Sequence, residues 1–123
     1  MKILVVEDEA ALANVLKEKF QAEGFEADFV QSGDVAIAET KKMNPDIIVL
    51  DLLLPKKDGF EVLKELKENT DLKSIPVIVL SNLGEDESIK RAIQLGAADY
   101  FVKTQHPINE IVEKVKEQAE KGR

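Results

Sequence analysis

Five side chains with reactive or charged groups follow short apolar runs at widely separated places in this 123-residue sequence: Glu7, Asp8, Asp51, Ser81 and Lys103. An aspartate can attack phosphorus and form an aspartyl phosphate when cations neutralise the incoming oxygens. Carboxylates can hold such a cation, and a hydroxyl or an ammonium group can hold phosphoryl oxygens. These residue types indicate phosphoryl transfer, provided that the fold brings them together.

The apolar runs that precede these residues have the pattern of strands covered on both faces. They are rich in Val, Ile and Leu with little alternation, and they span residues 3–6, 27–30, 47–50, 77–80 and 100–102. Apolar residues at helical spacing lie between the runs and after the last one. Five strand–helix units in succession predict a doubly wound α/β sandwich of three layers, with a parallel sheet and helices on both faces.

One apolar stripe of each predicted helix should face the sheet. The stripes include Leu12, Val15, Leu16 and Phe20 in the first helix, Val35, Ala38 and Met43 in the second, and Ile89, Ala92 and Ile93 in the fourth. Gly24 and Gly96 stand where C-terminal caps are expected, and Ser32 is a candidate N-cap.

The three acids are candidates for a metal site. Ligands bind such sheets beyond the carboxyl ends of the strands, and the ends of neighbouring strands lie about 4.8 Å apart. If the first and third strands are neighbours, Glu7, Asp8 and Asp51 would crowd together and require a cation. The ligands are all oxygens, which favours Mg²⁺, and Mn²⁺ could occupy the same site. In the plainer alternative, Asp8 caps the helix that starts near Ala10, and Asp51 is an ordinary loop residue.

Ser81 and Lys103 add a hydroxyl and a cation to this edge of the sheet. The fifth strand lies roughly 10 Å from the third if one strand separates them, and the lysine stem can cross that gap. Each residue also has a simple alternative, because serine often begins turns and a lysine at a strand end is usually solvated. Their combination with the acids favours phosphoryl transfer by positioning and charge neutralisation.

Composition excludes several other classes of protein. The net charge of −7 argues against direct nucleic-acid binding and against adhesion to an anionic membrane. No apolar run approaches the roughly 20 residues that a membrane span needs, and the run after Met1 stops at acids too early for an export signal. The chain has no cysteine, so a reducing compartment suits it. We expect one domain in the cytoplasm, without membrane insertion.

The motifs around these residues resemble the receiver domains of bacterial two-component response regulators, from Lys2 to about Ala119. They are Glu7-Asp8, the segment 51–59 (Asp-Leu-Leu-Leu-Pro-Lys-Lys-Asp-Gly), Ser81-Asn82, and the segment 96–103 (Gly-Ala-Ala-Asp-Tyr-Phe-Val-Lys). The resemblance implies a flavodoxin-like sheet of strand order 2-1-3-4-5 and a single receiver domain over residues 1–123. It also implies a signalling switch that is not an enzyme.

The resemblance implies a role for each motif residue. Asp51 would accept a phosphoryl group from a sensor histidine kinase or a histidine phosphotransfer protein. Mg²⁺ would be held by Asp8 and Asp51 directly, by Glu7 through water and by the backbone carbonyl of Leu53. Ser81 and Lys103 would hold phosphoryl oxygens, and Tyr100 would swing inward with Ser81. The output partner, unidentified from sequence, would bind the fourth helix, fifth strand and fifth helix. Alternatively, Tyr100 is an ordinary half-buried aromatic.

The chain departs from the family pattern at three positions. Thr104 replaces the usual proline after the lysine, so the following loop is either strained or differently routed. Asn82 is bulkier than the usual residue and should narrow access to the phosphate, and Glu7 replaces a commoner Asp. Leu53 and Leu83 are expected to exclude water and lengthen the phosphorylated lifetime, together with Asn82. His106 is expected to be a simple loop residue.

Other functions fit the sequence less well. An aspartate-nucleophile phosphatase needs a general acid where Leu53 stands. A flavodoxin-like electron carrier needs a phosphate loop where Glu7, Asp8 and Glu9 would repel phosphate. A degenerate receiver would lack part of the phosphorylation set. We expect a single-domain regulator, and the alternative is a receiver fragment of a larger DNA-binding or enzymatic regulator.

Overall fold

A computed structural model describes residues 1–122 and shows one sheet of five parallel strands. The strand order is β2-β1-β3-β4-β5, which confirms the predicted class and order. The strands are β1 (Lys2–Val6), β2 (Glu26–Val30), β3 (Ile47–Leu50), β4 (Val77–Ser81) and β5 (Asp99–Val102). Four of the five begin or end one residue beyond the apolar runs, because the flanking polar residues still pair along the sheet.

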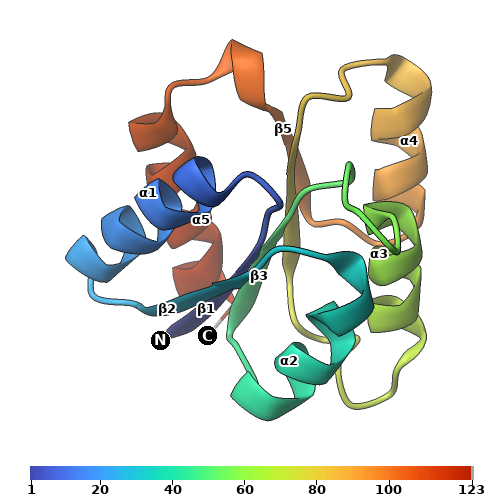
Figure 1. The fold of residues 1–123 in the computed structure, drawn as a ribbon, viewed down its shortest axis with the longest axis horizontal. Helices are drawn as coiled ribbons and strands as arrows, with labels where there is room; N and C mark the ends of the chain where they lie inside the picture. Colours follow the sequence, from blue (N-terminus) through green and yellow to red (C-terminus); the bar gives the residue numbers. More distant parts are fainter. Residues whose placement is uncertain (123) are drawn as a thin grey trace.

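Helices cover both faces of this sheet (Figure 1). One face carries α1 (Ala10–Ala22) and α5 (Ile108–Lys121). The opposite face carries α2 (Ala36–Met43), α3 (Gly59–Glu68) and α4 (Asp86–Gln94). Two short 3-10 helices, η1 (Gly33–Val35) and η2 (Lys103–Gln105), precede α2 and α5.

The central strand β3 divides the interior into two hydrophobic cores. Ile47 and Val49 pack with α1 and α5, whereas Ile48 and Leu50 pack with α2, α3 and α4. All four side chains are at most 1% exposed, and burial of each contributes about 1.5–3 kcal/mol to folding. The end of β3, which Asp51 follows, is therefore packed on both sides.

Parts of the predicted helical stripes were wrong. Val15, Val35 and Ile93 are 37%, 44% and 47% exposed, and Ala38 is also exposed. In the second unit, η1 delays the helix until Ala36, so the packed side of α2 is shifted to Ala36 and Thr40. In α4, the small residue Ala92 makes the buried contact and leaves Ile93 on the outer side.

The structure confirms the predicted C-terminal helix caps but not the predicted N-terminal cap. Gly24 and Gly96 have φ values of +92° and +108°, which confirms the two glycine caps. Ser32 precedes η1, but its hydroxyl donates to the carboxylate of Asp34 and does not cap a backbone N–H. Within residues 1–122, no helix is both long and apolar enough to cross a membrane.

Candidate functional site

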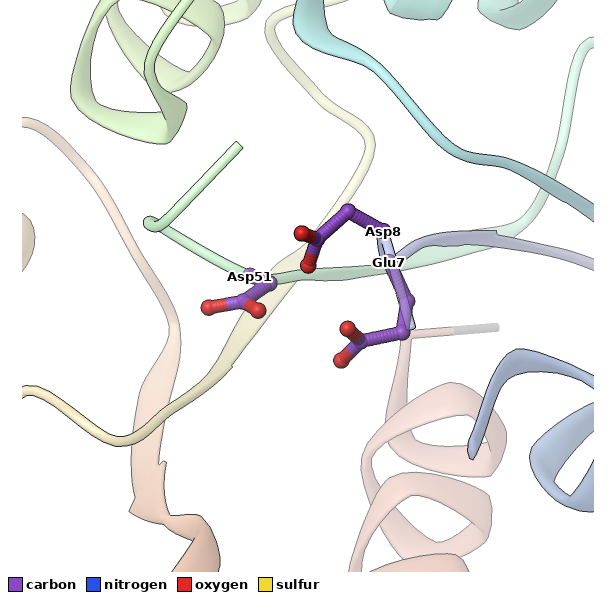
Figure 2. Close-up of side chains that lie close together, drawn as sticks. All are labelled: Glu7, Asp8 and Asp51. Carbon is purple, nitrogen blue, oxygen red and sulfur yellow. The ribbon is translucent and has the colours of Figure 1, made fainter. Parts of the chain in front are cut away.

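The ends of β1 and β3 bring three acids together. Val6 pairs with Leu50 in the sheet, so Glu7, Asp8 and Asp51 follow neighbouring strands. One carboxylate oxygen of each lies within 4.8 Å of the others. Figure 2 shows the carboxylates of Asp8 and Asp51 facing each other, with that of Glu7 beside them. Glu7 and Asp51 are only 2% and 3% exposed, whereas Asp8 is open to solvent.

Lys103 reaches this acidic cluster from β5, across the end of β4. Its Nζ lies 2.9 Å from Asp51 Oδ2 and 2.7 Å from Glu7 Oε1. The lysine stem therefore spans the two strand spacings that the sequence required. The contact with Glu7 was not foreseen, because the sequence reasoning considered this lysine only as a partner of phosphoryl oxygens.

Burial raises the pKa of Glu7 from its ordinary range to about 7, although hydrogen bonds from Lys103 and from the Glu9 backbone N–H oppose this. Burial also lowers the pKa of Lys103, but its hydrogen bonds to Glu7 and Asp51 outweigh that effect and the net shift is upward. Both shifts stabilise the protonated forms, which are the neutral Glu7 carboxyl group and the Lys103 ammonium group. With three carboxyl groups and one ammonium group, the ionised form of the cluster carries an excess of negative charge, which a divalent cation would relieve.

The raised pKa of Glu7 predicts a pH-dependent stability of the metal-free protein. Between pH 4.5 and 7 the unfolded chain releases the Glu7 proton while the folded protein retains it, so stability falls as pH rises through this window. Relative to Glu7→Gln, wild type should lose about 1–3 kcal/mol of unfolding free energy between pH 5 and pH 8. Urea denaturation in EDTA at several pH values measures this difference. A constant difference would contradict the assignment.

Two glycines, Gly59 and Gly33, shape the loop after Asp51. A Cβ on Gly59 would lie 2.3 Å from the Asp51 carbonyl oxygen, and a Cβ on Gly33 would lie 1.8 Å from the Lys57 carbonyl oxygen. Asp58, directly before Gly59, is the N-cap residue of α3, and its Oδ1 accepts a hydrogen bond from Glu61 N at 3.0 Å. In the sequence, the dipeptides Ser32-Gly33 and Asp58-Gly59 are the signals that indicate tight turns at these two places.

Lys56 lies in the same loop with a φ of +69°, in the left-handed region that costs a side chain roughly 1–2 kcal/mol. Lys56→Gly should therefore raise the unfolding free energy by about 0.5–1 kcal/mol, since glycine adopts this conformation freely. Urea denaturation tests this. As a matched control, Lys64→Gly inside α3 should lower stability by about 1 kcal/mol. If both substitutions changed the unfolding free energy in the same direction, the prediction would be contradicted.

Ser81 was expected to follow its strand, but it is the last residue of β4 and is fully buried. The pairing of Ser81 with Val102 extends the strand by this residue. Its Oγ accepts from Leu83 N at 3.4 Å, which is a long contact.

Asp8 does not cap α1, because Glu9 holds the N-cap position and makes no side-chain capping bond. The capping alternative for Asp8 is therefore wrong.

Tyr100 points toward the loop between β4 and α4. Its hydroxyl donates to the carbonyl of Leu83, and its ring packs against the core beneath α2, α3 and α4. Burial, together with the nearby charges of Glu85 and Asp51, raises the pKa of Tyr100. The side chain thus links β5 to the segment that follows Ser81, while its action as a switch stays a prediction.

The segment after Lys103 follows a trans peptide and turns directly within η2. Residues 1–122 contain no cis peptide, and Thr104 sits in the 3-10 turn η2. His106 stacks edge-on against Phe101 at 5.2 Å and pairs with Glu110 at 2.9 Å, so it anchors the loop to α5. Of the residues proposed to control phosphate lifetime, Leu53 is 51% exposed, Asn82 is exposed and Leu83 is half-buried.

Comparison with known proteins identifies the family. The family model described as "Response regulator receiver domain" matches residues 3–116. The chain therefore belongs to the receiver domains of two-component response regulators. Receiver domains bind a divalent metal at an acidic pocket, and this chain has such a cluster in Glu7, Asp8 and Asp51.

Individual relatives agree with this assignment. The phosphate regulon transcriptional regulatory protein PhoB of Rhizobium meliloti (strain 1021) is 39% identical over 83% of the chain and 45% of that protein. The receiver domain of Francisella response regulator 1452 has a TM-score of 0.90 and 30% identity, covering 99% of this chain and 98% of that one. The Mn²⁺-bound response regulator Rcp1 has a TM-score of 0.80 and 32% identity, covering 94% and 89%. The chain spans about half the length of the curated relatives that it matches.

Proposed function

We propose that this chain is a phosphorylation-controlled switch that takes a phosphoryl group from a phosphohistidine onto Asp51 with the help of a divalent cation. The donor would be a sensor histidine kinase or a histidine phosphotransfer protein. The observation that carries the proposal is the convergence of Glu7, Asp8 and Asp51 with one ammonium group. Asp51 and Glu7 are both buried and both contact Lys103 Nζ, at 2.9 Å and 2.7 Å, and Asp51 is the one that follows the central strand β3 directly.

The donor set suits Mg²⁺ or Mn²⁺. Asp8 and Asp51 would bind the ion directly, with Glu7 acting through water and Leu53 through its backbone carbonyl. When bound, the ion would neutralise charge on the incoming phosphoryl oxygens. The excess negative charge of the cluster supports this assignment, and so does the relative Rcp1, which has been seen with Mn²⁺.

The protein's own groups would complete the transfer by position and charge. An oxygen of the Asp51 carboxylate would form a bond to phosphorus while the bond from phosphorus to the donor's histidine nitrogen breaks, and that nitrogen would keep the electron pair. The Leu53 N–H, 3.2 Å from Asp51 Oδ1, would orient the carboxylate. Lys103 would turn from Asp51 to a phosphoryl oxygen, and the Ser81 hydroxyl would donate to another. Drawing Ser81 toward the phosphate would shift the Leu83 segment, to which Tyr100 is bonded, and so alter the α4, β5 and α5 surface.

The rival functions fit the geometry less well. Leu53 supplies no general acid for a phosphatase, and the acidic end of β1 would repel the phosphate of a flavin. A degenerate receiver would lack part of the set, whereas this chain has the three clustered acids, the lysine that contacts two of them, and the serine at the end of β4. We therefore propose a signalling switch and not an enzyme, acting through an output protein or an attached output domain.

The proposal is tested with acetyl phosphate as donor. The full chain with Mg²⁺ should gain the mass of one phosphoryl group, and EDTA should abolish the gain because the negative cluster then meets the donor unshielded. Intact-protein mass spectrometry measures both results. A chain that gains no phosphoryl group with Mg²⁺ present, or gains it equally well in EDTA, would refute the proposal.

The lifetime of the phosphorylated state should depend on Leu53. Its half-exposed apolar side chain stands two residues after Asp51, where it can keep hydrolytic water from the phosphoryl group. Leu53→Asn should accelerate dephosphorylation several-fold, which is followed by loss of the phosphoryl mass after the donor is removed. Ile93→Asn, at a similarly exposed apolar residue on α4, is the matched control and should leave the rate unchanged. An unaltered rate in Leu53→Asn would refute the role.

A further inference from the structure

A pocket of about 280 Å³ opens beside the acidic cluster, between α1, the end of β4 and the start of α5. Its floor is apolar and consists of Leu12, Leu80, Ile108 and Ile111. Leu80 and Ile111 are each only 2% exposed, so the floor is the top of the hydrophobic core and not a loose surface groove.

The rim of this pocket is polar and is shared with the proposed phosphorylation site. Lys103 lines the pocket while its Nζ contacts Asp51. Asn82 and Thr104 complete the rim. These two residues lie far apart in the sequence and both depart from the family pattern, yet they meet at the same pocket. The amide and the hydroxyl could donate to oxygens of a ligand that lies over Lys103.

The chemistry at Asp51 restricts which small phosphoryl donors can react. Leu53 stands where a general acid would be needed, so the leaving group must depart without receiving a proton. In an acyl phosphate, an Asp51 oxygen forms a bond to phosphorus while the bond from phosphorus to the acyl oxygen breaks. The leaving oxygen keeps the electron pair and departs as a carboxylate, which is stable as an anion at neutral pH. No proton, oxidant or further reactant is needed.

We infer that the pocket binds the hydrocarbon part of a short-chain acyl phosphate whose phosphoryl group is transferred to Asp51. The inference rests on the proposed function and specifies a class of small-molecule donor. Lys103 and Asn82 face the carboxylate end of the ligand, and the floor takes its carbon chain. Glu9, at the edge of the pocket, disfavours a second anionic group on the chain and so selects an uncharged hydrocarbon.

The test compares acetyl phosphate with butyryl phosphate below saturation, with Mg²⁺ present, by following the phosphoryl mass on Asp51. Each buried methylene contributes about 0.8 kcal/mol, or roughly fourfold in rate. Butyryl phosphate carries two more methylenes, so it should react about 15 times faster than acetyl phosphate. Ile108→Ser and Leu12→Gln make the floor polar and should bring this ratio close to one, because the longer chain loses more apolar contact than the shorter one. Ile93→Ser, on the exposed side of α4, is the matched control and should keep the ratio.

Equal rates for the two donors in wild type would overturn the inference, as would a preference that survives in both floor variants. If acetyl phosphate loads Asp51 without any chain-length preference, only the pocket assignment fails. If neither donor loads Asp51 in the presence of Mg²⁺, the proposed function fails as well.

Discussion

Asp51→Asn should abolish phosphoryl incorporation, with a loss of at least about a thousandfold in the rate of mass gain from acetyl phosphate with Mg²⁺. The amide that replaces the carboxylate is a poor nucleophile and a weaker metal ligand, whereas its size and shape are nearly unchanged. Asp51 is only 3% exposed and follows β3, whose side chains pack into both cores.

The matched control for this substitution is Asp58→Asn, seven residues further along the same loop. Asp58 caps α3 through its side chain, and asparagine caps helices about as well as aspartate. Asp58→Asn should therefore fold and accept a phosphoryl group at the wild-type rate. Residual loading of Asp51→Asn above a few per cent would show that another side chain is the acceptor.

Lys103→Met should separate metal binding from phosphoryl transfer. In residues 1–122, Lys103 is the cation whose side chain is paired with Asp51, and it is paired with Glu7 as well. Its removal takes one donor from the phosphoryl oxygens and should slow transfer by about 100–1,000-fold. The same removal frees two carboxylates, so Mg²⁺ should bind more tightly, by roughly tenfold.

Titration with Mg²⁺ and the rate of phosphoryl mass gain measure the two effects of Lys103→Met. Lys57→Met removes a lysine that pairs with Glu65 and not with Asp51, and it should change neither quantity by more than about twofold. If Lys103→Met accepts the phosphoryl group at the wild-type rate, the lysine does not hold the phosphoryl oxygens. Weaker Mg²⁺ binding in that variant would contradict the competition between the two cations.

Local sequence determined the α/β class and the edge of the sheet at which the candidate site residues lie. Runs such as residues 47–50 are apolar at every position, as in a strand that is covered on both faces. Polar residues directly after such runs lie at the same edge of a parallel sheet. The caps at Gly24 and Gly96 were likewise predictable, because a left-handed helix end is a local requirement.

Tertiary structure decided the features that depend on contacts between distant segments. Nothing near Glu7 in the sequence indicates that Lys103 will pair with it, because that contact depends on the order of the strands and on burial of both groups. The close approach of Gly33 to Lys57, the bond from Tyr100 to Leu83 and the meeting of Asn82 with Thr104 at one pocket are of the same kind. Periodicity fixes which side of a helix is apolar, whereas the packing of neighbours decides which apolar residues, such as Ala92 but not Ile93, are buried.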